Sequence, residues 1–292
     1  MNVLDIKLIG DIPFYVSPDS ADVWANPSCF KLGRDLKPTL VAGVPPDVFS
    51  KDGQFWGNPI YDWEYQKKTD FTWWKSRLFH NCRMYDTLRI DHFRAFADYY
   101  SISSGCTDAK SGKWEKGIGM YFWNSVKPVI KNTEIIAEDL GGETPIVEKL
   151  IKDSGFPNMK VLQFAFDSDL SDPFLPKNYN SNCICYTGTH DNDTTVGWYH
   201  NATQRERLIF NKLVPLDKSG SIALSLISYG MKSKAKTVII PFPDYLELDS
   251  EGRINTPGKE NGNWEWRFEK EALTEELERK VLRLSEKRNN IK

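Results

Sequence analysis

The stretch Thr87-Leu88-Arg89-Ile90-Asp91-His92 is a short apolar run that ends in charged and polar residues. Runs of this kind recur along the chain, at residues 6–11, 134–139, 159–167, 184–191 and 237–241. Such runs are typical of strands that are buried on both faces of a parallel sheet. Because helical or loop segments separate them, the sequence predicts repeated strand–helix units.

Acidic residues stand at the C-terminal ends of five of these runs, namely Asp11, Asp91, Glu138, Asp167 and Asp191. In a (β/α)8 barrel those ends converge on the face that holds the active site. An open doubly wound sheet would also gather ligands there, but it usually brings a glycine-rich phosphate loop, which this sequence lacks. We therefore expect an α/β fold, an incomplete (β/α)8 TIM barrel with about six of its eight strands. It should form one catalytic domain over residues 1–292, with a loop-rich insertion at about 15–75.

Helical spacing appears between the runs. One predicted helix carries Phe122 and Val126, and another opens at Thr144-Pro145 with a cap and a first-turn proline. Residues 271–290 predict an amphipathic helix whose apolar stripe consists of Leu273, Leu277, Val281 and Leu284.

Composition limits the class of protein. The formal net charge of −2 gives no reason to expect nucleic acid or an anionic membrane as a partner. We find no apolar run long enough to span a membrane and no signal peptide at the start. The five cysteines show no zinc-ligand spacing and fit free thiols in a reducing cytosol. We expect a cytoplasmic protein without metal or cofactor, and the sequence does not decide its oligomeric state.

The acidic residues permit several kinds of chemistry. Three carboxylates suffice for glycoside exchange, which needs a nucleophile, an acid and stabilisation of a cationic transition state. Yet Arg89 and Asp91 could form a structural ion pair, and Glu138 could cap a helix. Residues 190–193, His-Asp-Asn-Asp, could form a turn or bind a metal ion, as in a metal hydrolase. The residues alone indicate a barrel enzyme with an acidic site and leave the substrate open.

An ordered set of motifs resembles the amylomaltase or disproportionating-enzyme family, glycoside hydrolase family 77, which is allied to the α-amylases. The resemblance spans nearly the whole chain. Its segments are IGDIPFYVSPDSADVWANP (9–27), VAGVPPDVFSKDGQFWGNPIYDW (41–63), LRIDHFRAF (88–96), IIAEDLG (135–141), FPNMKVLQFAFD (156–167), YTGTHDNDTTVGW (186–198), NTPG (255–258) and GNWEWRF (262–268).

The resemblance implies a retaining 4-alpha-glucanotransferase that acts on maltooligosaccharides or starch as donor and acceptor. It implies that Asp91 is the nucleophile, Glu138 the general acid/base and Asp191 the stabiliser of the transition state. Arg89 would hold Asp91 ionised, and the surroundings of Glu138 should raise its pKa. The residues implied to lie around the sugar are Asp11, His92, Asp167, His190 and Asn192.

Residues 53–61 resemble the family's lid beside the acceptor site, with Trp56, Asn58, Pro59 and Tyr61 as sugar contacts; the alternative is a rigid surface loop. A retaining mechanism predicts carboxyl groups of Asp91 and Glu138 about 5–5.5 Å apart. Two alternatives stay open at this point: an α-amylase-type hydrolase and a noncatalytic glucan-binding remnant.

The family normally extends upstream of residue 9, into a part expected to hold the first two barrel strands. We therefore expect this chain alone to be poorly stable and weakly active or inactive, because a six-strand remnant leaves unpaired edges. Residues 240–246 also depart from the family pattern, which has Gln before the Asp and Leu-Gly after it.

Overall fold

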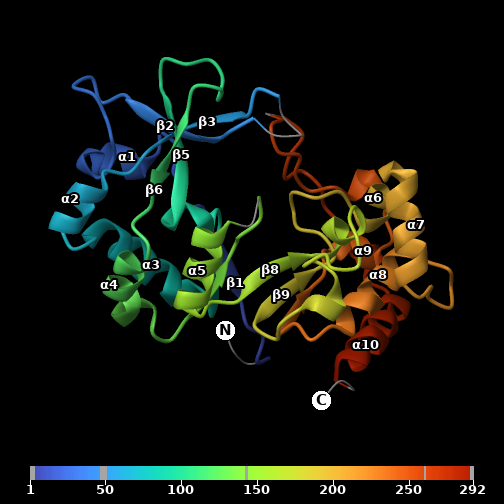
Figure 1. Cartoon of the computed structure of the whole chain (residues 1–292). Coiled ribbons are helices and arrows are strands. Elements are labelled where there is room, and N and C mark those ends of the chain that lie inside the picture. Colours follow the sequence, from blue (N-terminus) through green and yellow to red (C-terminus); the bar gives the residue numbers. More distant parts are fainter. Residues whose placement is uncertain (1–3, 47–50, 142–143, 260, 290–292) are drawn as a thin grey trace. The chain divides into compact units, whose positions relative to one another are not determined.

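The computed structural model describes residues 4–46, 51–141, 144–259 and 261–289. The chain divides into two compact units, Met1–Asn158 and Met159–Lys292 (Figure 1). Two compact units can belong to one catalytic domain or to two, so the single catalytic domain over residues 1–292 stays a prediction.

Three parallel strands form the sheet of the first unit, in the order β1 (Ile9–Ile12), β4 (Thr87–Ile90) and β7 (Glu134–Ala137). Ala137 also pairs with Asn158, the first residue of β8 (Asn158–Val161). All four residues of β4 are buried, which agrees with the expectation from its continuous apolar run.

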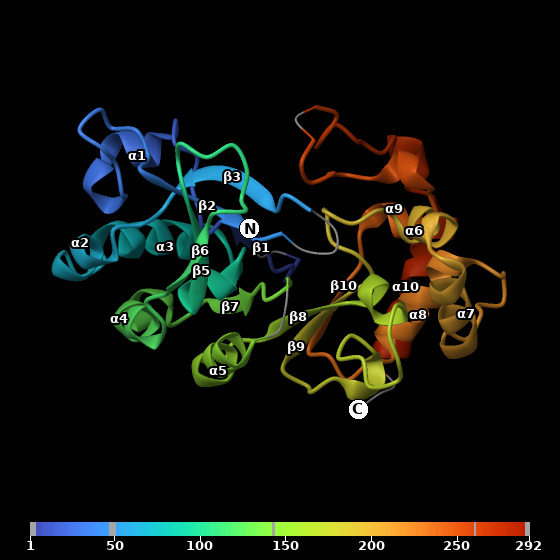
Figure 2. The ribbon, with the colours of Figure 1, turned by 45° about the horizontal axis from the view of Figure 1, so that its top comes forward.

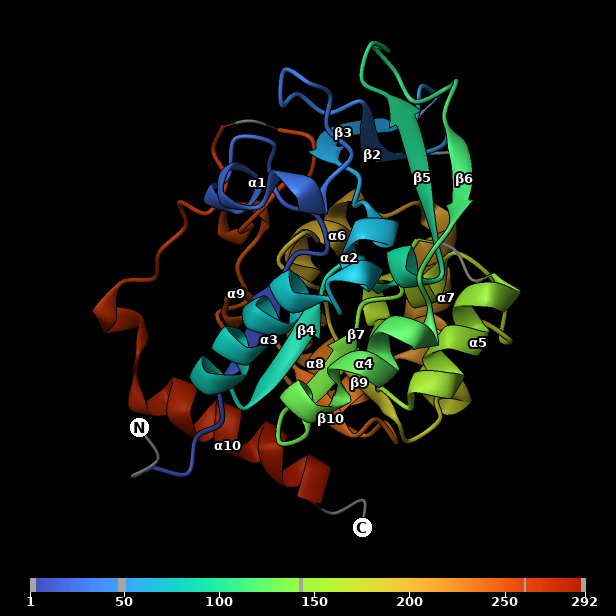
Figure 3. The same cartoon turned by 90° about the vertical axis from the view of Figure 1, so that its left-hand side faces the viewer.

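Three helices lie against this sheet: α3 (Thr72–Met84), α4 (Met120–Ile130) and α5 (Pro145–Ser154) (Figure 3). The predicted opening of α5 is confirmed, since Pro145 is its first residue and Gly155 ends it at φ 69°. Thr144 occupies the N-cap position, but its side chain makes no capping hydrogen bond.

A second, antiparallel sheet belongs to the same unit and has the order β3-β2-β5-β6. Its strands are β2 (Leu40–Val44), β3 (Gln54–Pro59), β5 (Asp98–Ser103) and β6 (Lys113–Lys116). The predicted loop-rich insertion thus also holds regular elements, including the short helices α1 (Ala21–Ala25) and α2 (Trp63–Lys68). This sheet was not predicted, because Gly43 and Gly57 interrupt its strands and the β2–β3 register shifts.

Aromatic side chains fill the core of the first unit. Trp74 and Trp123 are fully buried, and Phe14 contacts the rings of Trp74 and Phe96. Packing in the core therefore explains part of the high tryptophan content.

In the second unit, β8 is followed in the sheet by β9 (Cys183–Tyr186) and β10 (Thr237–Ile239), which pair in parallel. Its helices are α6 (Thr195–Asn201), α7 (Gln204–Leu213), α8 (Ile222–Met231), α9 (Phe242–Tyr245) and α10 (Glu275–Asn289) (Figure 2). The sheet order β1-β4-β7-β8-β9-β10 with intervening helices confirms the expected incomplete (β/α) barrel.

Two predicted elements differ in their bounds. The run 159–167 is a strand only to Val161 and continues as a 3-10 helix over Leu162–Phe166. The terminal helix begins at Glu275 rather than residue 271, and Leu273 of the predicted stripe is 57% exposed. Leu284 does pack, in a cluster with Leu224 and other residues of α8. Among the described residues, no helix is both long and apolar enough to cross a bilayer.

Candidate active site

The C-terminal ends of three neighbouring strands bring acidic residues together in the first unit. Asp11 of β1 is in register with Arg89 of β4. Asp91 and Glu138 each directly follow the last register pair of β4 and β7. Because neighbouring strands lie about 5 Å apart, Asp91 and Glu138 start from adjacent backbone positions. The separation of their carboxyl groups stays a prediction.

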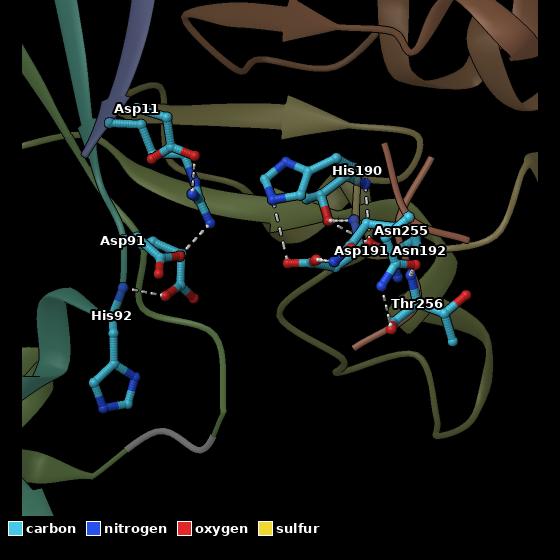
Figure 4. A network of polar contacts seen from close by, with 12 residues as sticks. Asp11, Asp91, His92, His190, Asp191, Asn192, Asn255 and Thr256 are labelled. Atoms are coloured by element: carbon cyan, nitrogen blue, oxygen red, sulfur yellow. Dashed lines mark hydrogen bonds and ion pairs between the residues drawn. The ribbon is translucent and has the colours of Figure 1, made fainter. Parts of the chain in front are cut away.

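Arg89 bridges two of these carboxylates. Its side chain is buried, and Nη1 donates to Asp11 Oδ2 at 2.6 Å while Nη2 donates to Asp91 Oδ1 at 2.9 Å (Figure 4). The two ion pairs compensate the buried guanidinium and fix the position of Asp91. This is the contact to Asp91 that the spacing of residues 89 and 91 suggested.

Glu138 is the buried member of the group, with 7% of its surface exposed. Oε2 accepts a hydrogen bond from His92 N at 2.7 Å, and Oε1 accepts one from Leu140 N at 2.7 Å. Burial and the negative charge of Asp91 raise the pKa of Glu138 to about 7, although Arg89 and the two backbone donors act in the opposite direction. The raised pKa agrees with the expectation for a general acid, because Glu138 can carry its proton near neutral pH.

His92 adopts a left-handed backbone conformation with φ 50° and ψ 44°, which is costly for a residue other than glycine. This conformation directs its N–H to Glu138. Burial, with a smaller effect from the charge of Arg94, lowers the pKa of His92 to about 3. The imidazole is therefore neutral near pH 7 and offers one donor and one acceptor nitrogen.

The predicted lid segment is largely strand β3. The ring of Trp56 is 36% exposed and meets the His92 ring edge-on, with centroids 4.9 Å apart. Asn58 Nδ2 donates to Val16 O at 2.9 Å, and Pro59 is buried in register with Val41 of β2. Trp56 is thus the large exposed side chain of this segment that lies beside a site residue.

Tyr61 corrects the prediction for this segment. Its side chain is only 1% exposed, its hydroxyl donates to Phe14 O, and its ring lies among those of Trp63, Trp73 and Trp74. Tyr61 is therefore a core residue and has no surface for a direct sugar contact. Sequence alone could not separate this tyrosine from Trp56 five positions earlier.

In the second unit, the loop after β9 carries His190 and Asp191. Asp191 Oδ1 accepts a hydrogen bond from Asn255 Nδ2 at 2.6 Å, and Asp191 Oδ2 lies 3.4 Å from His190 Nε2 (Figure 4). The His190 ring also packs against Trp264, with centroids 5.0 Å apart. The Asp191 carboxylate is thus held from two sides while 40% of its side chain stays exposed.

Arg253 and Asn255 are site residues that the sequence did not single out. Arg253 Nη2 donates to Asp191 O at 2.9 Å, and Asn255 N donates to His190 O at 3.0 Å. Asn255 belongs to the family segment NTPG (255–258), to which no role was assigned from the sequence. Its place in a family segment could have marked it as a candidate site residue.

Asn192 shapes the turn between His190 and Thr194. Its Oδ1 accepts hydrogen bonds from Thr189 N at 2.9 Å and Thr189 Oγ1 at 2.8 Å. The side chain of Asn192 therefore has the turn-forming role that was one interpretation of residues 190–193. A contact between Asn192 and the sugar stays a prediction. Among the described residues, no group of three or more His, Cys, Asp or Glu side chains is arranged to hold a metal ion.

Asp167 does not stand at a strand end as predicted, because it follows the 3-10 helix that continues β8. It is exposed, and the charges that act on its carboxyl include those of Asp172 and, from the start of α7, Glu206. Burial and Asp172 raise its pKa. Near the end of β8, it is Gln163 that reaches the β9 loop, donating to Asp193 O at 2.9 Å.

Glu138 should make stability depend on pH. Its pKa rises from 4.5 to about 7 on folding, so the stability associated with the protonated form is complete below about pH 4.5. That contribution, roughly 3 kcal/mol, is lost as pH rises through about 7. In Glu138→Gln, chemical denaturation should show a smaller loss of unfolding free energy between pH 5 and pH 9 than in the wild type.

The glutamine cannot accept both backbone hydrogen bonds, but that cost is independent of pH and cancels in the difference. Asp91→Asn is the companion variant, since it removes the second cause of the raised pKa and should reduce the same loss. Equal losses in the wild type and Glu138→Gln would contradict the assignment.

Comparison with known proteins identifies the family. Residues 1–274 match the sequence profile of glycoside hydrolase family 77, described as 4-alpha-glucanotransferase. The chain is 46% identical to the 4-alpha-glucanotransferase of Clostridium butyricum, over 97% of this chain and 59% of that protein. It is 44% identical to that of Thermus thermophilus, over 91% and 54% of the two chains.

The structure resembles that of an amylomaltase from Streptococcus agalactiae solved in complex with acarbose. The TM-score is 0.93 at 39% identity, and the match covers 97% of this chain and 58% of that one. The chain spans about half the length of the curated relatives it matches. By its profile match and its identity to these proteins, the chain belongs to the 4-alpha-glucanotransferases of glycoside hydrolase family 77.

Proposed function

We propose that this chain carries the catalytic carboxylates of a retaining 4-alpha-glucanotransferase, which transfers segments of α-1,4-glucan between maltooligosaccharide or starch chains. The observation that carries the proposal is the pair Asp91 and Glu138. One carboxylate is bound by Arg89, and the other is buried with a pKa of about 7. A retaining mechanism needs such a pair, an ionised nucleophile and a protonated acid close to it.

In the first half-reaction, an Asp91 carboxylate oxygen attacks the anomeric carbon of the donor. Glu138 gives its proton to the glycosidic oxygen, the C–O bond to the leaving chain breaks, and an ester forms between the glucan and Asp91. The ion pair with Arg89 keeps the Asp91 oxygens in place for the attack. As Asp91 becomes a neutral ester, its negative charge, which together with burial raised the pKa of Glu138, disappears.

In the second half-reaction, Glu138 is a carboxylate and accepts the proton of an acceptor hydroxyl. The acceptor oxygen attacks the anomeric carbon, the ester bond breaks, and Asp91 recovers its negative charge. The pKa of Glu138 then returns to about 7 and the acid is ready again. Because the pKa of Glu138 falls when Asp91 loses its charge and rises when Asp91 regains it, Glu138 can serve in both proton transfers without another group.

Asp191 is proposed to bind sugar hydroxyl groups and to stabilise the positive charge of the transition state. The support is its place in the family motif at residues 186–198 and the exposure of its side chain. The S. agalactiae amylomaltase was solved in complex with acarbose, and we propose that this chain binds acarbose at the same carboxylates. Asp11, His92 and His190 would supply further polar contacts to the sugar.

Single substitutions of the three carboxylates test the function. With maltotriose as donor and acceptor, the protein should form glucose together with longer maltooligosaccharides, at the low rate expected of an incomplete barrel. Asp91→Asn, Glu138→Gln and Asp191→Asn should each lower that rate by about 1,000-fold or more, measured by chromatography of the products. Glucose release without longer products would favour a hydrolase, and full activity in Asp91→Asn would contradict the assignment of the nucleophile.

Transfer rather than hydrolysis requires that water be kept from the glycosyl ester until an acceptor binds. We propose that Trp56 does this, because its exposed ring lies against His92, whose N–H contacts the acid Glu138. Asn58 and Pro59 would hold the strand that carries the ring.

Trp56→Ala should therefore raise the ratio of hydrolysis to transfer severalfold, because water gains access to the ester. The ratio is read from reducing-end release against longer products. Trp24→Ala is the matched control, since Trp24 is 85% exposed on α1, and its ratio should equal that of the wild type. An unchanged ratio in Trp56→Ala would rule out the lid role.

We also propose that the protein works in the reducing cytoplasm, because its five cysteines are all free thiols, three of them buried. Alkylation of cell lysates under denaturing, non-reducing conditions should label all five cysteines in protein recovered from the cytosolic fraction. Cysteines protected as disulfides, or recovery from another compartment, would contradict this proposal.

A further inference from the structure

Asp244 is a buried carboxylate with no part in the mechanism above. It lies in α9, the short helix that follows β10, and only 1% of its surface is exposed. Its described hydrogen-bond donors are all uncharged groups of two threonines, Thr187 and Thr195. A carboxylate in such surroundings is costly and persists where its hydrogen bonds fix a particular arrangement.

The arrangement that Asp244 fixes is a loop closure. Oδ2 accepts hydrogen bonds from Thr187 Oγ1 at 2.6 Å and from Thr195 Oγ1 at 2.8 Å, while Oδ1 accepts one from Thr195 N at 2.7 Å. Thr187 directly follows β9, and Thr195 is the first residue of α6. One carboxyl group therefore joins both ends of the loop 188–194.

That loop carries His190 and Asp191, and its two ends attach it to the scaffold together with the hydrogen bonds that Arg253 and Asn255 make to its middle. Asn192 and Thr189 bond to each other within the loop. Gln163 and Ser250 bind Asp193 near its second end. Rotation of either end would move the Asp191 carboxylate away from its partner Asn255, because the loop is short and internally bonded.

We propose that Asp244 is a positioning residue for Asp191 and His190, which acts by clamping the two ends of the loop 188–194 through Thr187 and Thr195. The catalytic consequence rests on the proposed function of Asp191, whereas the clamp itself is a property of the second unit. Residues 240–246, which depart from the family pattern, would then contribute by supporting the neighbouring loop.

The clamp is tested by hydrogen exchange, which needs no substrate. In Asp244→Asn, amides of residues 188–194 should exchange about tenfold faster or more, and Asp244→Ala should exceed it because no acceptor remains. Asp172→Asn is the matched control: Asp172 is a buried carboxylate of the same unit that accepts from Ser168 Oγ and Phe174 N. Its variant should leave exchange of residues 188–194 unchanged. Unchanged exchange in Asp244→Ala, or equal acceleration throughout the second unit, would overturn the clamp.

The catalytic consequence is tested with α-maltosyl fluoride as donor, whose good leaving group keeps slow variants measurable. Asp244→Asn should lower kcat by roughly 10- to 100-fold with a smaller change in KM, and Asp172→Asn should retain the wild-type kcat. In an Asp191→Asn background, Asp244→Asn should cause a much smaller further loss, because only its effect through His190 remains. An equal further loss would overturn the positioning role. A wild-type protein without transfer activity would reject the proposed function, and the exchange result would still decide the clamp.

Discussion

The chemistry of the first unit depends on one buried cation. Arg89 extends from the central strand β4 and binds Asp11 on one side and Asp91 on the other. The guanidinium would be costly to bury without both partners. The same two ion pairs therefore stabilise the fold and position Asp91 in the site. Burial, together with the negative charge of Asp91 beside it, lets Glu138 keep its proton up to about pH 7. Under the proposed function, these unequal surroundings would give the two carboxyl groups two different roles.

In the second unit, several contacts hold the exposed carboxylate of Asp191, which lies on a loop. Asn255 holds the Asp191 side chain, Arg253 holds its backbone carbonyl, and Asp244 joins the ends of the loop. Each contact comes from a segment that follows β10, so the last part of the chain is needed to organise residues near β9. Rigid support of this kind is what a preorganised site requires, because loops are otherwise the most mobile parts of a fold.

Most of the parallel strands could be predicted from short apolar runs, and Asp91 and Glu138 were recognisable because each directly follows such a run. Asp11 instead lies within β1, and Asp167 follows a 3-10 helix. The antiparallel sheet escaped prediction because glycines and a shifted register break the alternation of its strands. Tyr61 and Trp56 belong to one motif, yet only packing shows that the first is buried and the second exposed. Asn255 lies 64 residues from Asp191 in sequence, a contact that no local pattern reveals.

Direct detection of the glycosyl ester on Asp91 tests the central claim. In Glu138→Gln, α-maltosyl fluoride can still react with Asp91, because fluoride leaves without a proton, whereas the acceptor lacks its base and the ester should accumulate. Mass spectrometry of a peptic digest should then find one maltosyl group on the peptide that contains Asp91. A maltosyl group on a different residue, or unmodified protein that nevertheless turns over the donor, would contradict the account.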